Sequence, residues 1–370
     1  MRTRIVIPLL LGIVSVTVYW LQREPASGAA TSPAAGKMEV RTHVTDPGKN
    51  ISDWHRSATA PETASSLAAL GSALKSLPPA EAVSAIRRFM QSGGDKPTGL
   101  EFVIGSGNQL TGWPTLRTFL LDLLAAIDPA EAAALGREIL ATPTTPDEWA
   151  IALRNVGRVD TSADAREFLR AKTEELIRNP QWQEKPTIGY LNAFDALVHT
   201  GATESTPLLS GLIQRKDRKD LAHAGFLTLD RLVQRQPVPM LRILAADSAL
   251  HQSRPEMVAQ QFARADLRDA PQREIVKDWL LDPARKPMEL RAFAASYPNN
   301  NQMISNNLLT SEITNSGADL ATHDRQVLEI ITGWQADPAL QSITPYLQTI
   351  ATRLAGFVTS PGPSDTSPVK

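Results

Sequence analysis

The 370-residue sequence contains no cysteine, and only 5% of its residues are aromatic. The absence of cysteine excludes disulfide bonds, a thiolate nucleophile, zinc–thiolate sites and a lipid attached to cysteine. An excess of one charge is also lacking, because 38 lysine and arginine residues balance 39 aspartate and glutamate residues. The basic residues are dispersed and create no positive field, so we expect no nucleic-acid partner.

Sequence signatures of catalysis are missing as well. No two of the six histidines have the three- or four-residue spacing that places metal ligands on one helical face. Gly105-Ser106-Gly107 lacks the lysine and hydroxyl of a phosphate-binding loop, and no serine lies in a Gly-x-Ser-x-Gly elbow. We therefore predict that the protein is not an enzyme and that it binds no cofactor and no metal ion.

The N-terminus predicts a membrane-directed segment. Arg2 and Arg4 lie in a cytoplasmic region, residues 1–4, and precede an uncharged run, residues 5–21. This run approaches the length of a transmembrane helix, and its positive flank places the following chain on the periplasmic side. The prediction is a single-pass signal-anchor. The alternative is a signal peptide cleaved near residue 28, which would release a soluble periplasmic protein.

Helical patterns occupy residues 58–357. They lie between a predicted disordered tether, residues 22–57, and a predicted disordered tail, residues 358–370, whose small and polar residues cannot form a core. The clearest pattern runs from Trp113 to Thr161. It contains apolar residues at helical spacing and cap residues followed by proline, which begin successive helices about 16 residues apart. These starts are Pro114, Asp128-Pro129 and Thr145-Pro146.

The remaining helices are predicted from proline positions and apolar periodicity. Ser253 and Glu256 have the spacing of a capping box. Two stretches break the helical pattern. Residues 92–112 predict a β-hairpin near 100–110 that turns at Gly105–Asn108, and residues 297–317 predict an asparagine-rich loop around a short apolar core. Helix starts are expected near Pro61, Pro79, Thr161, Lys185, Pro207, Lys219, Pro237, Pro255, Pro271, Pro287, His323 and Pro338.

This succession of short antiparallel helices resembles the α-solenoid superfamily of HEAT-like and armadillo-like repeats. Residues 114–158 are similar to exported bacterial helical-repeat proteins with no assigned activity. The resemblance implies an all-α fold, a right-handed stack of antiparallel helix pairs, and a concave surface that binds a protein or an extended ligand. We therefore predict a membrane-anchored extracytoplasmic scaffold or adaptor with a protein partner.

Several side chains are candidates for the binding surface or for the core. Trp182 and Trp334 lie near predicted helix junctions and are the candidate binding-surface residues, whereas Trp149 lies on an apolar stripe and is predicted to be core. Three polar residues beside such stripes are expected either at the surface or in hydrogen bonds between helices: Arg117, Arg154 and Asn155.

The alternative function is an all-α enzyme whose site lies in residues 92–112. Glycines in this stretch accompany charged and amide side chains that could converge in a cleft. The residues concerned are Asp95, Lys96, Glu101 and Asn108.

Overall fold

Helices dominate the computed structural model of the chain, which describes residues 47–301, 305–311 and 316–359. The predicted all-α class is confirmed for these residues, apart from one small two-stranded antiparallel sheet. In chain order the elements are α1 (Pro47–Asp53), α2 (Ala60–Lys75), α3 (Pro79–Gln91), β1 (Val103–Ile104), η1 (Ser106–Asn108), β2 (Leu110–Gly112), α4 (Leu116–Ile127), α5 (Pro129–Ile139), α6 (Pro146–Val159), α7 (Ala163–Arg178), α8 (Pro180–Glu184), α9 (Ile188–Ala193), α10 (Asp195–Thr200), η2 (Thr203–Ser205), α11 (Thr206–Ile213), α12 (Lys219–Arg235), α13 (Pro237–Ala246), α14 (Ser248–Ser253), α15 (Pro255–Phe262), α16 (Ala270–Leu281), α17 (Pro287–Ser296), α18 (Gly317–Gln335), η3 (Pro338–Ile343) and α19 (Thr344–Thr359).

Helix α1 lies inside the predicted disordered tether and was not expected. Ile51 of this helix is fully buried, and α1 packs against α3. Trp54, which follows α1, is also buried, and its indole N–H donates to the Ser66 hydroxyl at 3.1 Å. The apolar groups of this polar stretch are thus covered by helices that come later in the chain. Residues 1–46 and 360–370, which contain most of the predicted tether and tail, lie outside the described ranges.

Two of the predicted caps begin helices in the structure. The Asp128 carboxylate accepts from the Glu131 N–H at 3.0 Å and begins α5, and the Thr145 hydroxyl accepts from the Glu148 N–H at 3.2 Å and begins α6. The capping box predicted at Ser253 is wrong. That hydroxyl donates to a carbonyl of the preceding helix α14, and α15 begins without a side-chain cap.

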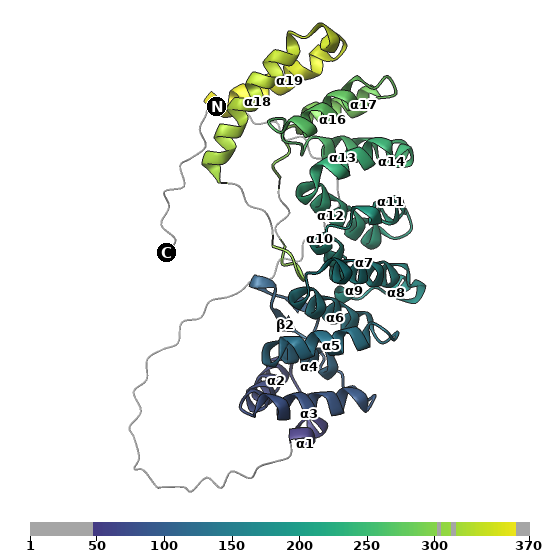
Figure 1. The fold of residues 1–370 in the computed structure, drawn as a ribbon, viewed down its shortest axis with the longest axis vertical. Coiled ribbons are helices and arrows are strands. Elements are labelled where there is room, and N and C mark those ends of the chain that lie inside the picture. Colours follow the sequence, from purple (N-terminus) through teal and green to yellow (C-terminus); the bar gives the residue numbers. More distant parts are fainter. Residues whose placement is uncertain (1–46, 302–304, 312–315, 360–370) are drawn as a thin grey trace, which may run out of the picture. The chain divides into compact units, whose positions relative to one another are not determined.

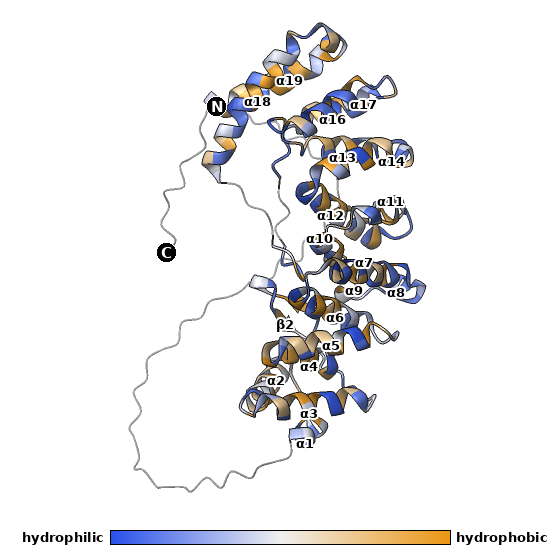
Figure 2. Ribbon diagram, in the orientation of Figure 1, coloured by the Kyte–Doolittle hydropathy of each residue, from blue (hydrophilic) through white to orange (hydrophobic). Residues whose placement is uncertain are grey.

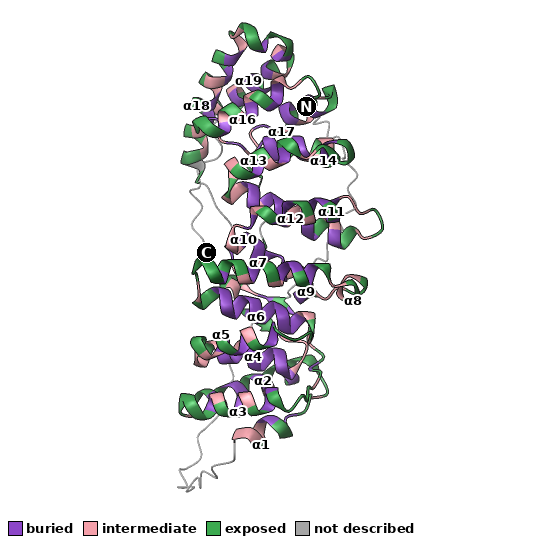
Figure 3. Ribbon diagram, turned by 45° about the vertical axis from the view of Figure 1, so that its right-hand side comes forward, coloured by how far each residue is buried: buried purple, intermediate pink, exposed green. Residues whose placement is uncertain are grey.

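Helices that are close in sequence pack against one another. Contacts join α3 to α4, α4 to α5 and α5 to α6. They continue through α7, α10, α12, α13, α15 and α17 to α19, which pairs with α18. These helices lie side by side in Figure 1. Hydrophobic and hydrophilic residues alternate around them (Figure 2), and the buried residues lie mainly where neighbouring helices face each other (Figure 3). Trp149 is 1% exposed and belongs to this core, as predicted.

Polar side chains tie α4 to α6 within the core. Arg117 donates to both carboxylate oxygens of Glu148, at 2.8 and 3.0 Å, and Arg154 donates to the Asp122 carboxylate at 2.5 Å. The Asn155 amide donates to the Leu121 carbonyl at 3.0 Å. Of the two predicted roles for Arg117, Arg154 and Asn155, hydrogen bonding between helices is therefore the one observed.

The predicted β-hairpin is confirmed. Strands β1 and β2 pair antiparallel, with Val103 opposite Gly112 and Ile104 opposite Leu110. The turn needs left-handed backbone, which Gly107 (φ 65°) and Asn108 (φ 62°) supply, because glycine and asparagine tolerate this region best.

The prediction of a transmembrane helix is corrected. In residues 47–301, 305–311 and 316–359 no helix is both long enough and apolar enough to cross a bilayer. The longest of these helices, α18, carries Asp319, Asp324, Arg325 and Glu329, charges that a membrane interior would exclude. The segment for which the span was predicted, residues 5–21, lies outside the described residues.

Candidate functional site

A segment without helix or strand follows α17 and runs beside α10 and the β-hairpin (Figure 1). We call its residues 305–311, Ser-Asn-Asn-Leu-Leu-Thr-Ser, the return segment, because they come back to helices that precede them by over 100 residues. Its backbone polar groups have no secondary-structure partners and must be satisfied by other groups. Helices α10 and α12 and the hairpin supply hydrogen-bond partners.

Asp195, the first residue of α10, makes the central contact. Its Oδ2 accepts from the backbone N–H groups of Leu309 and Thr310 at 2.7 and 2.8 Å, and its Oδ1 accepts from the Thr310 hydroxyl at 2.5 Å. Asp195 is 5% exposed and Thr310 is 6% exposed. Since hydrogen bonds to a charged acceptor are strong, one carboxylate fixes two successive peptide units and one side chain.

Apolar contacts accompany this polar one. Leu308 is fully buried, and the methyl groups of Leu309 lie 3.3 Å from the position that a Cβ would occupy on Gly157 of α6. Gly157 therefore lets the leucine approach the helix backbone closely.

Amide and guanidinium groups hold both ends of the return segment. Asn306 donates to the Ile104 carbonyl at 3.0 Å, and Asn108 donates to the Thr310 carbonyl at 3.3 Å, so the hairpin flanks one side. On the other side, two arginines one turn apart on α12 donate to the segment: Arg231 to the Ser305 hydroxyl and Arg235 to the Ser311 carbonyl.

A pocket of about 330 Å³ opens beside the return segment, between α9, α10 and α12. Leu191, Phe194 and Leu227 give it apolar walls, and its polar lining includes His223 and Asp220. Arg218 donates to Asp220 at 2.7 Å, and this hydrogen bond holds the pKa of that carboxyl below its usual value. The pocket therefore combines apolar walls with a carboxylate that stays charged at neutral pH. We call it the α12 pocket.

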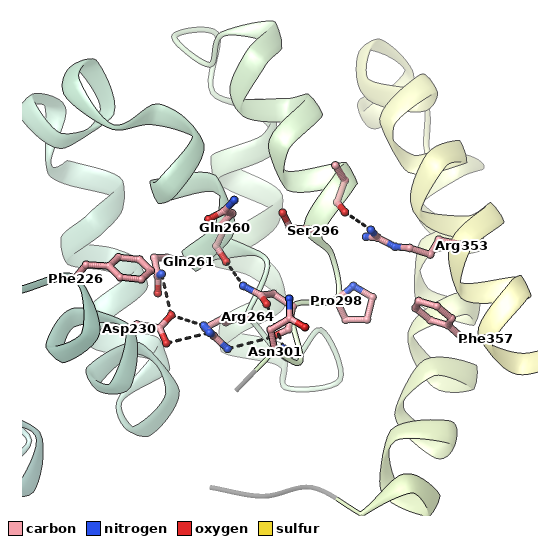
Figure 4. A pocket seen from close by; sticks show the side chains of 12 residues that line it. Phe226, Asp230, Gln260, Gln261, Arg264, Ser296, Pro298, Asn301, Arg353 and Phe357 are labelled. Carbon is pink, nitrogen blue, oxygen red and sulfur yellow. Dashed lines mark hydrogen bonds and ion pairs between the residues drawn. The ribbon is translucent and has the colours of Figure 1, made fainter. Parts of the chain in front are cut away.

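A second cavity, of about 430 Å³, lies along the same helix α12 toward its C-terminal part (Figure 4). Two charges in its wall form an ion pair, because Arg264 donates to both carboxylate oxygens of Asp230, at 2.5 and 2.9 Å. Arg353 donates to the carbonyls of Ala294 and Ala295, and burial lowers its pKa. These polar groups join α12 to the end of α15, and α17 to α19.

The candidate binding-surface tryptophans occupy other positions. Trp334 is 8% exposed and belongs to the core beneath α18. Trp182 is half-buried, and its ring meets that of Trp149 edge to face with the centroids 5.2 Å apart. Neither residue lines the α12 pocket. Both tryptophans therefore contribute to packing in this structure.

The polar residues of the alternative enzyme site mostly make contacts that hold their own segment. Asp95 accepts from the backbone N–H groups of Lys96 and Arg117, and the Lys96 ammonium donates to the carbonyls that end α1. Asn108 binds the return segment, and Glu101 is exposed. Within the described ranges, no group of histidine and carboxylate side chains could hold a metal ion.

Sequence reasoning did not single out Asp195, Leu308 or the paired arginines Arg231 and Arg235. The signal for Leu308 was present, since a Leu-Leu pair interrupts an asparagine-rich stretch. No comparable signal marks Asp195, which has the sequence position of an ordinary first-turn carboxylate. Comparison of the chain with protein-family models, with curated proteins and with solved structures finds no match.

Proposed function

We propose that the protein is an α-solenoid that binds a non-helical segment of a protein partner, at the surface formed by the α12 pocket and the side chains that hold the return segment. The observation that carries this proposal is the set of contacts made by Asp195, which satisfies two backbone N–H groups and a hydroxyl of an irregular peptide. This surface already binds peptide chemistry within the chain itself.

The character of the α12 pocket supports the proposal. Its walls include Leu191, Phe194 and Leu227, which suit an apolar side chain, and its polar residues include Asn192 and His223, which suit a peptide backbone. Pockets that combine apolar walls with a few polar groups are the usual form of a binding site. Asp195, which holds the return segment, also lines the pocket, so a peptide in the pocket would lie next to the groups that bind that segment.

The repeat architecture is part of the same proposal. Neighbouring helices pack in sequence order, and caps and first-turn prolines recur along the chain, as in proteins built from stacked helix pairs. Such proteins act by binding along a surface to which several repeats contribute, and α9, α10 and α12 contribute to this one. A location outside the cytoplasm stays a prediction from the N-terminal sequence.

The test is selection from a displayed library of random peptides, followed by measurement of peptide affinity by fluorescence anisotropy. We expect Leu227→Glu, which places a charge in the α12 pocket, to weaken binding of selected peptides at least about 10-fold. The matched control is Ile188→Glu, because Ile188 is 45% exposed on α9 and does not line the pocket. The proposal fails if no peptide is enriched or if both variants weaken binding equally.

A further inference from the structure

We infer that the return segment is an internal ligand of this surface, and that the partner displaces it with a segment of the same chemistry. The inference rests on the proposed function and specifies it further. The partner segment would carry a leucine in the place of Leu308 and a threonine or serine in the place of Thr310. Its two successive backbone N–H groups would bind Asp195 as those of Leu309 and Thr310 do.

The contacts of the return segment are of a kind that another chain can reproduce. Asp195, Asn108 and Arg235 bind its backbone or hydroxyl groups, which any peptide with a suitably placed hydroxyl residue provides. Only Leu308 supplies a fully buried apolar side chain. Recognition therefore centres on a short pattern, leucine followed two residues later by a hydroxyl residue. The Asn306 amide, which donates to the Ile104 carbonyl, and the buried Asn307 add to it.

Covalent attachment makes the return segment a strong competitor. A tethered ligand competes at an effective concentration on the order of millimolar, so a peptide of equal intrinsic affinity binds the intact protein weakly. A partner must therefore bind more tightly than the return segment or offer additional contacts. The α12 pocket has Asp195 in its lining and apolar walls from α9 and α12, and it supplies a place for such contacts.

The experiment uses the full chain and a labelled peptide with the sequence of residues 305–311, SNNLLTS, acetylated and amidated at its ends. We compare the wild-type protein with Thr310→Val, which removes the hydroxyl and keeps the shape of the return segment. We expect the peptide to bind Thr310→Val at least about 10-fold more tightly, because the internal competitor is weakened. A peptide with alanine in place of the first leucine is the matched control and should bind at least about 10-fold more weakly.

A second measurement keeps the inference testable if Thr310→Val alters folding. In the wild-type protein the backbone amides of Leu309 and Thr310 should be protected from hydrogen exchange, and saturating peptide should lower that protection.

Equal peptide affinity for both proteins would overturn the inference, as would failure of the peptide to bind Thr310→Val. Peptides selected from a library could still bind the α12 pocket in either case, so the proposed function would stand. If light scattering showed dimers of the protein that dissociate when the peptide is added, the segment bound at this surface would come from a second copy of this chain. A separate partner would then be excluded.

Discussion

The buried ion pair between α4 and α6 allows a sharp test of the packing. Arg117 and Glu148 have side chains that are 11% and 2% exposed, and the arginine binds the carboxylate through two nitrogens. A third nitrogen donates to the Met90 carbonyl at the end of α3 at 2.8 Å. Replacing one partner leaves the other charge buried and unpaired. We therefore expect Glu148→Leu or Arg117→Met alone to lower the free energy of unfolding by about 3–5 kcal/mol.

The double variant should be more stable than either single variant. Arg117→Met with Glu148→Leu removes both charges and fills the space with apolar groups, a change that costs little when volumes match. Urea unfolding followed by circular dichroism measures each free energy, and the double-mutant cycle gives the coupling between the two sites. If the two losses simply added within about 0.5 kcal/mol, the pair would not be coupled and the reasoning would be refuted. Glu175→Ala is the control, because its pair with Lys172 is more exposed and should contribute less than about 1 kcal/mol.

Three further predictions concern single sites. Burial raises the pKa of Asp147 above 3.8, so its contribution to stability is present below pH 3.8 and is lost as pH rises through the folded-state pKa. In urea unfolding, Asp147→Asn should therefore be more stable than wild type at pH 7 but not at pH 3. The same difference in unfolding free energy between variant and wild type at both pH values would contradict this. Gly112→Ala should cost about 1–3 kcal/mol in the same assay, because its Cβ would lie 2.4 Å from the Glu101 carbonyl oxygen; a neutral effect would show that the hairpin relaxes freely. Leu308→Ala should lower the free energy of unfolding by about 2–5 kcal/mol because the Leu308 side chain is fully buried, and no loss of stability would mean that the return segment is not packed.

The sequence by itself determined the local elements of this protein. Helix starts at Asp128 and Thr145 and the hairpin turn at Gly107 were predicted correctly, because caps and turns depend on groups within about four residues of one another. The sequence also predicted a loop with a short apolar core in residues 297–317. The described residues 305–311 have no helix or strand, and Leu308 among them is buried.

Only the tertiary structure decided which distant groups meet. Asp195 and Thr310 are separated by 115 residues, and neither position reveals the other, because any first-turn carboxylate has the same local pattern. The same holds for Arg117 and Glu148. The glutamate lies in the first turn of α6, and its side chain pairs with an arginine on another helix. Helix formation follows from local hydrogen bonds and periodicity, whereas the candidate site depends on how the faces of α6, α10 and α12 are brought together by packing.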